Sequence, residues 1–249
     1  MELGLKNYKI EFFSSIKDLP FDRFQEFNRF SMLDTEIGST MDDFDKVVVR
    51  INEFIQKDLK DDSVRELINL RTIVNHVLSG TNHRGLAFVC LIKKLNGKEV
   101  TDYGEENLKK ILKKLSDAGL TVGDVIDKGG EVKKKIETEL ELFFPSMFDN
   151  ILQKEGRTQM KARLMALCDM IIEDDKGAVA KKLFDIELAM LRLVKPKNFM
   201  GKNSYEIQFE KNYQMVVCNL SAHTNKDINK MTVLEVYTLM EILQKKNTE

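Results

Sequence analysis

The residues from which a metal site would be built are few and poorly spaced. His76 and His83 are seven positions apart with Ser79-Gly80 between them, so they do not form the i, i+4 pair that lets two histidines on one helix bind zinc. His223 is isolated in the sequence. We therefore interpret all three as surface histidines with satisfied hydrogen bonds, and we predict no metal site from them.

Carboxylates are too abundant for their positions to identify a catalytic pair, because the chain contains 40 acidic residues. Asp42, Asp43 and Asp45 cluster, but they fall in the first turn of a predicted helix, where the helix dipole favours negative charge. These three carboxylates could bind a hard cation, although no EF-hand loop follows them. Glu173-Asp174-Asp175 is interpreted as a solvated helix end.

Motifs for phosphate binding and nucleophilic catalysis do not occur in the sequence. It contains neither Gly-x-x-x-x-Gly-Lys-Ser/Thr nor Gly-x-Gly-x-x-Gly. A nucleophile needs a base that is itself oriented, and with three histidines and no Gly-x-Ser-x-Gly none can be nominated. The glycine-bearing segment 119–130 lies between predicted helices and is interpreted as a turn. We predict that the protein is not an enzyme and uses no cofactor.

The three cysteines also lack the spacing of a functional site. Cys90, Cys168 and Cys218 are scattered through apolar segments, and no Cys-x-x-Cys occurs. An odd number of separated cysteines does not suggest a disulfide framework. We predict that all three are reduced core residues of a cytosolic or phage-type protein.

Composition and charge describe a globular chain without an obvious polyanionic partner. The 249 residues are 43% hydrophobic and 32% charged, with a formal net charge of -1. Near-neutral charge gives no electrostatic reason to expect nucleic acid or an anionic membrane as the main partner. A basic loop from Lys195 to Lys202 keeps nucleic-acid binding as a weaker alternative. There is no signal-peptide pattern, and the longest apolar run, Leu86 to Ile92, is far shorter than the roughly 20 residues of a membrane span.

The N-terminal half predicts a short strand followed by helices. Residues 8–13 alternate as a strand, and Pro20 begins a helix whose phenylalanines recur every third residue and face the core. A second helix, capped by Ser39 or Thr40, and a third, after Ser63, follow. Their apolar residues are predicted to point inward: Phe44, Val47, Val48, Ile51, Phe54 and Ile55 in the second helix, and Val64, Leu67, Ile68, Leu70, Ile73, Val74, Val77 and Leu78 in the third.

The segment 86–103 has two interpretations. It is either a helix that ends at Gly97 or a buried strand followed by a hairpin with a tight Asn96-Gly97 turn. We favour the helix because Lys93 and Lys94 interrupt the alternation of a strand but fit one polar side of a helix.

The C-terminal half consists of further predicted helices. Gly129-Gly130 is expected to be a hinge or turn, and the basic loop 195–203 is the candidate for mobility. In the helix 157–173, we expect Met160, Leu164, Leu167, Cys168 and Ile171 to point inward. The helices are predicted at residues 105–118, 131–144, 157–173, 178–194, 205–222 and 232–244.

The helix 232–244 has a thin polar face. Thr232 and Glu235 have the spacing of a capping box, and apolar residues cover most of its circumference. Such a helix is packed on more than one side, so it is either a central core helix or a core helix that also meets another subunit. The residues that would form the second contact are Val233, Val236, Tyr237 and Met240.

The predicted fold is therefore mainly α, a bundle of about nine to eleven helices with a short N-terminal strand and at most one small hairpin. We divide it into an N-terminal helical lobe with an edge strand (1–118), a connecting segment that contains glycine and proline (119–156) and a C-terminal helical lobe (157–249). The two lobes can also pack as one domain.

Several strings, which together span most of the chain, carry a family resemblance. They resemble uncharacterised structural-region proteins of tailed bacteriophages, in particular those of the crAss-like phages of gut Bacteroidales. The strings are Leu19-Pro20, Arg23-Phe24, Phe27-Asn28, Ile37-Gly38-Ser39, Asp43-Phe44-Asp45, Ala87-Phe88 through Asn96-Gly97, Phe144-Pro145, Phe148-Asp149, Phe209-Glu210-Lys211, Leu220-Ser221 and Met231 through Tyr237.

The resemblance implies a virion component or assembly factor of the portal–tail region, without catalytic residues. A connector-ring subunit, a tail component, a tail assembly chaperone and a packaged cargo protein all fit it. Its partners would be other phage structural proteins and copies of itself in a symmetric assembly, formed in the host cytoplasm and located in the virion. The alternative from a different class is a soluble helical regulatory or ligand-binding protein.

Overall fold

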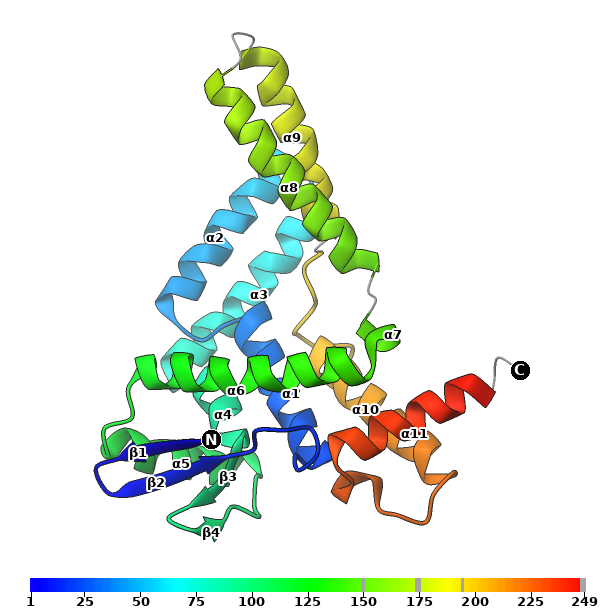
Figure 1. Cartoon of the computed structure of the whole chain (residues 1–249). Helices are drawn as coiled ribbons and strands as arrows, with labels where there is room; N and C mark the ends of the chain where they lie inside the picture. The colour runs from blue at the N-terminus through cyan, green and yellow to red at the C-terminus, as the bar shows by residue number, and fades with distance from the viewer. Residues whose placement is uncertain (149–150, 173–175, 194, 247–249) are drawn as a thin grey trace.

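The structure is a computed structural model that describes residues 1–148, 151–172, 176–193 and 195–246 (Figure 1). The described residues form eleven α-helices and a small antiparallel sheet, which confirms the mainly α fold with an N-terminal strand and a hairpin. The helices are α1 Phe21–Glu36, α2 Met41–Gln56, α3 Lys60–Ser79, α4 His83–Cys90, α5 Glu105–Asp117, α6 Val122–Phe143, α7 Pro145–Phe148, α8 Ile151–Ile172, α9 Lys176–Leu193, α10 Tyr205–Ser221 and α11 Val233–Lys246, with a short 3-10 helix, η1, at Ile228–Lys230.

The sheet contains four strands in the order β1-β2-β3-β4, namely Glu2–Leu5, Tyr8–Phe12, Ile92–Leu95 and Lys98–Glu99. All neighbouring strands are antiparallel. Asn96 and Gly97 have positive φ angles of 51° and 76°, which suits a tight turn between β3 and β4. The predicted strand at residues 8–13 is confirmed as β2, whereas β1 was not predicted.

The preferred helix for residues 86–97 is correct only as far as Cys90, and the hairpin alternative describes the rest. The reason is a long-range contact that periodicity does not reveal. Arg23 of α1 is buried, and its guanidinium donates to the carbonyl oxygens of Cys90, Ile92 and Val100 at 2.8, 2.8 and 2.6 Å. These bonds satisfy carbonyl groups where the chain leaves the helix and enters the sheet.

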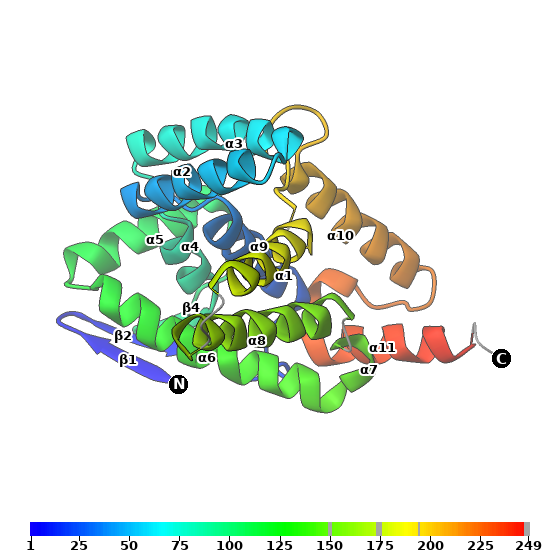
Figure 2. The ribbon, with the colours of Figure 1, turned by 90° about the horizontal axis from the view of Figure 1, so that it is seen from above.

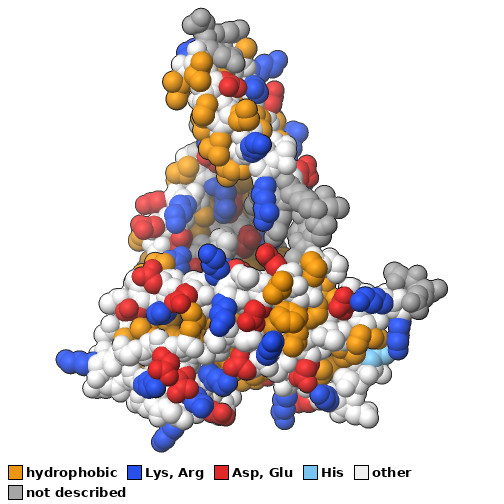
Figure 3. Space-filling model, viewed as in Figure 1, with side chains coloured by type: hydrophobic (Ala, Val, Ile, Leu, Met, Phe, Trp, Pro, Cys, Tyr) orange, Lys and Arg blue, Asp and Glu red, His pale blue; other side chains and the backbone are white. Residues whose placement is uncertain are grey.

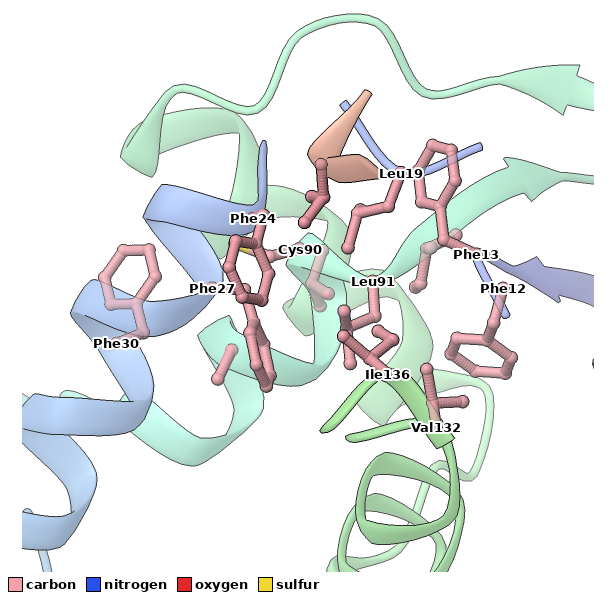
Figure 4. Close-up of a cluster of buried hydrophobic side chains, with 14 of the residues drawn as sticks. Phe12, Phe13, Leu19, Phe24, Phe27, Phe30, Cys90, Leu91, Val132 and Ile136 are labelled. Carbon is pink, nitrogen blue, oxygen red and sulfur yellow. The ribbon is translucent and has the colours of Figure 1, made fainter. Parts of the chain in front are cut away.

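The main hydrophobic core lies between α1, α4, α6 and the sheet (Figure 4). The expected phenylalanine stripe of α1 is confirmed, because Phe21, Phe24, Phe27 and Phe30 are all buried. Phe12 of β2 packs edge-on against Phe88 of α4, with ring centroids 5.1 Å apart. The core is thus assembled from segments that lie far apart in the sequence.

Helix α6 crosses this core without a break. The predicted hinge at Gly129-Gly130 is wrong, because both glycines lie inside α6. A side chain at position 129 would contact the ring of Phe88 at 3.4 Å, so the small residue lets α6 lie close to α4. The helix begins with a capping box between Thr121 and Asp124, as their spacing predicts.

The last helix is joined to the start of the first. The backbone N–H groups of Val233 and Leu234 donate to the carbonyl oxygens of Leu19 and Ile16, and that of Phe21 donates to Met231, at 2.8–3.0 Å. The Thr232–Glu235 capping box is present. The main core includes residues from Ile10 to Phe144 and from Leu220 to Val236, so both predicted lobes contribute to it. The division at 119–156 stays a prediction.

Candidate protein interaction surfaces

Helices α8 and α9 form a hairpin that projects from the rest of the molecule (Figure 1), and the view from above looks down on this hairpin (Figure 2). Among the side chains described in it, those of residues 155–172 and 176–193, only Ala166 and Val179 are buried. Ion pairs from Arg163 to Glu187 and from Lys182 to Asp169 join the two helices. The hairpin is therefore held together by a thin apolar seam and surface charge pairs.

Lys57, just after α2, connects this hairpin to the body. Its ammonium group lies 3.3 Å from the carboxylate of Glu187 and 3.9 Å from the ring centroid of Phe184. The Lys57 side chain is only 9% exposed, so this contact is one of the better-covered polar contacts of the hairpin. It joins the middle of α9 to the end of α2 and leaves the apolar stripe of α8 uncovered.

Helix α8 exposes an apolar stripe. The predicted inward orientation of Met160, Leu164, Leu167, Cys168 and Ile171 is wrong, because all five are exposed. A helix in a two-helix hairpin can be covered on one side only, and here Ala166 faces the inside. Figure 3 shows hydrophobic side chains along the projecting hairpin.

Helix α3 turns several polar residues inward, which overturns the prediction for five of its apolar residues, while Ile73 is buried as predicted and Leu70 and Val77 are half-buried. Its buried residues are Ser63, Glu66, Asn69 and Ile73. Its exposed large hydrophobic residues, five of the eight that were expected to point inward, are Val64, Leu67, Ile68, Val74 and Leu78. In α2, Val47 and Phe54 are buried as expected, whereas Val48 and Ile55 are exposed.

The inward polar residues of α3 have partners, which explains the reversal. The amide of Asn69 donates to the carbonyl oxygen of Lys197 at 2.7 Å and accepts from the N–H of Phe199 at 3.3 Å. Glu66 is ion-paired with Arg50 of α2 at 2.5 Å, and burial raises the pKa of its carboxyl, although Arg50 opposes this shift. The segment 195–204 is thus bound to the polar side of α3, and the apolar side stays in solvent.

Two hollows lie along the exposed side of α3. One, of about 700 Å³, lies between α3 and residues 196–208, and Val64 and Ile68 form part of its wall. The second, of about 320 Å³, is lined by Leu67, Ile68, Leu70, Arg71 and Val74. Because Ile68 borders both, we treat them as one surface, the α3 groove, defined by Val64, Leu67, Ile68, Arg71, Val74 and Leu78.

One of the three histidines, His83, does not lie where the sequence suggested, whereas His223 is exposed as predicted. His83 is buried, and its Nε2 lies 3.1 Å from Nδ1 of His76, which corrects the interpretation of His83 as a surface residue. Burial, with a smaller contribution from His76, lowers the pKa of His83 to about 4. Within the described ranges, no three His, Cys, Asp or Glu residues are grouped so that they could hold a metal ion.

The remaining predicted residues are split between core and surface. Cys90 is buried, but Cys168 and Cys218 are exposed, so the prediction of three core cysteines is wrong for two of them. Cys168 and Cys218 lie in apolar segments whose apolar residues are partly exposed, so an apolar neighbourhood in the sequence did not indicate burial. Asp43 caps α2 by accepting from Ser39 and Thr40, as helix-start carboxylates do.

The face of α11 proposed as a partner contact lies mostly against the core. Val233 and Val236 are fully buried. Tyr237 packs on Phe144, with ring centroids 5.5 Å apart, and Met240 is half-buried against the same core. This placement agrees with the core alternative for α11, and its role as a subunit contact stays a prediction.

The exposed stripes of α3 and α8 are therefore the surfaces that sequence reasoning missed. Their apolar spacing was visible, but periodicity alone does not say whether the covering element is in the same chain. No described helix is both long and apolar enough to cross a membrane. No family model, curated protein or solved structure matches this chain.

Proposed function

We propose that this chain is a non-enzymatic structural or assembly protein of a tailed bacteriophage, a component of the portal–tail region that acts through repeated protein–protein contacts. The observation that carries the proposal is the α8–α9 hairpin, which has two buried residues among its described side chains and an exposed apolar stripe. Large exposed apolar surfaces mark interaction sites on folded proteins. The sequence resemblance to phage structural proteins supplies the biological setting.

A second physical argument supports a stable partner. An isolated two-helix hairpin gains little from its own core and depends on packing against another surface. Each Leu-sized side chain that moves from solvent into an interface stabilises the complex by about 1.5–3 kcal/mol. The exposed hairpin residues Leu164, Ile171 and Ile172 are 56%, 82% and 78% exposed, so most of that gain is available only to a complex.

The experiment that tests the proposal is electron microscopy of purified virions combined with mass spectrometry of their proteins. We expect the chain in the particle, with its density in a ring or in the tail near the portal. A tail assembly chaperone would instead be found with assembling particles and lost from mature ones. A packaged cargo protein would be released with the genome. Absence from every stage of particle assembly would reject the proposal.

One observation favours a ligand-binding alternative. A hollow of about 200 Å³ lies between α1, α4 and α6, with Phe27, Phe88 and Leu91 as its apolar wall and Arg84 and Lys133 among its polar residues. Asp34 also lines the hollow and pairs with Arg84 at 2.9 Å, so the hollow suits a small molecule that has an apolar part and a polar or weakly acidic group. A ligand screen by thermal shift tests it, since a ligand that binds only the folded state raises Tm. No shift with amphipathic acids would remove this alternative.

A further inference from the structure

The α8–α9 hairpin and the α3 groove are two unlike apolar surfaces on the same chain. The hairpin is a projection, and its stripe contains Met160, Leu164, Leu167 and Ile171 at intervals of four, three and four residues. The groove is hollowed along one helix and faces solvent. Both surfaces are present in every copy, so one copy offers the projection and another offers the groove.

The two stripes have compatible spacing. In α3, Val64, Leu67, Arg71, Val74 and Leu78 follow intervals of three and four residues, as in α8. Alternation of three and four is the spacing at which side chains of one helix fit between those of a neighbouring helix in coiled-coil packing. At about 1.5 Å per residue, the two stripes are roughly 17 and 21 Å long. The two hollows themselves extend along α3 from Asp61 to Val74, so the hairpin stripe and the groove have similar lengths.

The size of the hairpin stripe also suits a stable interface. Six large apolar residues of α8, namely Met160, Leu164, Met165, Leu167, Ile171 and Ile172, are between 36% and 82% exposed. A fully exposed side chain of this size presents about 60–120 Å² of apolar surface, so these partly exposed residues present roughly 200–400 Å² together. A standard interface buries about 800 Å² per partner, and the aliphatic stems of flanking lysines and arginines can contribute much of the rest.

Charge does not oppose the contact. Residues 41–79, which contain α2 and α3, have six basic and eight acidic residues. Residues 151–193, which contain the hairpin, have eight basic and seven acidic residues. The two regions thus have small net charges of opposite sign, so two copies are not repelled when these surfaces approach.

From these observations we infer that the α8–α9 hairpin of one copy docks in the α3 groove of a second copy of this chain. The contact is heterologous, because different surfaces meet. A heterologous contact leaves one free hairpin and one free groove at the ends of every open oligomer, so growth continues until a ring closes or a filament forms. The inference rests on the proposed function, for which it identifies the repeated contact.

The native cysteines provide the first test without any substitution. Cys168 lies on the exposed stripe of α8, Cys218 lies exposed on α10, and Cys90 is buried. We expect assembly to slow the reaction of Cys168 with a maleimide by at least about tenfold, while Cys218 continues to react and Cys90 stays unreactive. Equal reaction of Cys168 and Cys218 in the assembled protein would overturn the inference.

A mixing experiment tests which surfaces meet. Leu164→Glu removes the hairpin surface and Leu67→Glu removes the groove surface, both at exposed positions that leave the core intact. We expect each variant alone to be monomeric by light scattering, and an equimolar mixture to form dimers only, because one intact hairpin meets one intact groove. A hairpin-to-hairpin dimer predicts a different result: Leu67→Glu would assemble normally and the mixture would gain nothing.

These results separate the inference from the proposed function. Oligomers that show Cys168 protection, formed by a chain absent from virions, would retain the inference and reject the phage role. A chain found in virions whose Cys168 stays reactive there would retain the role and reject the hairpin–groove contact. Circular dichroism of both variants checks that helicity is unchanged, and a variant that loses helicity is replaced by Ile171→Glu or Val74→Glu at the same surface.

Discussion

The α1–α4 region and the α8–α9 hairpin have similarly spaced apolar residues, which are buried in the first region and exposed in the second. In α1, phenylalanines at every third position are buried in the core, where Phe30 stacks on His83 of α4 and Phe21 packs on Tyr213 of α10. In α8, Met160, Leu164, Leu167 and Ile171 have equally regular spacing, yet they remain exposed. The difference shows that the spacing of an apolar stripe does not by itself reveal whether an element of the same chain covers it.

The two regions also differ in how their polar groups are used. The core region contains a buried arginine, Arg23, whose three hydrogen bonds join α1 to the segment that follows α4. The hairpin uses ion pairs between exposed or half-exposed side chains, such as Lys182 and Asp169, which contribute little stability. The core region is therefore expected to determine the stability of the fold, and the hairpin its assembly.

The largest effect is expected from Arg23→Met. Three carbonyl oxygens, those of Cys90, Ile92 and Val100, would lose their donor, and each unsatisfied buried group costs about 1–3 kcal/mol. We expect the free energy of unfolding in urea to fall by about 4 kcal/mol or more. Arg192→Met, at an exposed position of α9, is the control and should change it by less than about 0.5 kcal/mol. Similar losses for both variants would remove the distinction between core and hairpin.

A matched pair of apolar substitutions separates stability from assembly. Phe30→Ala in the core should lower the free energy of unfolding by about 3–5 kcal/mol, because Phe30 is fully buried. Ile171→Ser on the hairpin should change it by less than about 0.5 kcal/mol, because Ile171 is 82% exposed, and should instead weaken self-association. Urea titration and light scattering measure the two quantities. If the monomer of Ile171→Ser were strongly destabilised, the hairpin would have to be part of the core.

The same distinction explains what the sequence could and could not predict. Helix caps with local sequence signals formed: Thr40, one of the two candidates, caps α2, and Thr232 and Glu235 form the predicted capping box. The hairpin after Cys90 was not preferred, because its carbonyl groups are satisfied by Arg23, almost seventy residues earlier. The periodicity of a short segment cannot reveal a contact with a residue so far away in the sequence.

The prediction of which side of α3 faces the core was wrong for a related reason. In α3 an apolar stripe and a polar stripe run along opposite sides, and the rule that apolar residues face inward selected the wrong one. Asn69 and Glu66 can be buried because the segment 195–199 and Arg50 supply hydrogen bonds and charge. A sequence shows that a side chain is polar, but its burial depends on partners that only the fold brings near.

The buried His83 makes the stability of the core region decrease in acid. We expect no such dependence from the exposed hairpin. The pKa of His83 in the folded protein is about 4, below the ordinary value of about 6.5, so the unfolded chain takes up a proton first as pH falls. Stability is therefore fully present above pH 6.5 and decreases towards pH 4, by at most about 3 kcal/mol from this group.

Substitution of the histidine identifies this contribution. We expect His83→Phe to flatten the dependence of the free energy of unfolding on pH between about 6.5 and 4. His223→Gln, at an exposed position, is the control and should retain the slope of the parent protein. Urea titrations at several pH values measure the free energy of unfolding of each variant and hence its dependence on pH. An unchanged slope in His83→Phe would show that another group carries the acid sensitivity of the core.

The smallest effect concerns whether α6, which covers the core, is a continuous helix. Glycine inside a helix is less favourable than alanine by about 1 kcal/mol, and a side chain at position 130 would meet nothing within 4 Å. We expect Gly130→Ala to raise the free energy of unfolding by about 0.5–1 kcal/mol. Gly129→Ala should gain less, because its added methyl group would contact Phe88 at 3.4 Å. If Gly130→Ala lowered stability instead, the chain would need a bend at that position, and the rigid cover over the core would have to be replaced by two separate segments.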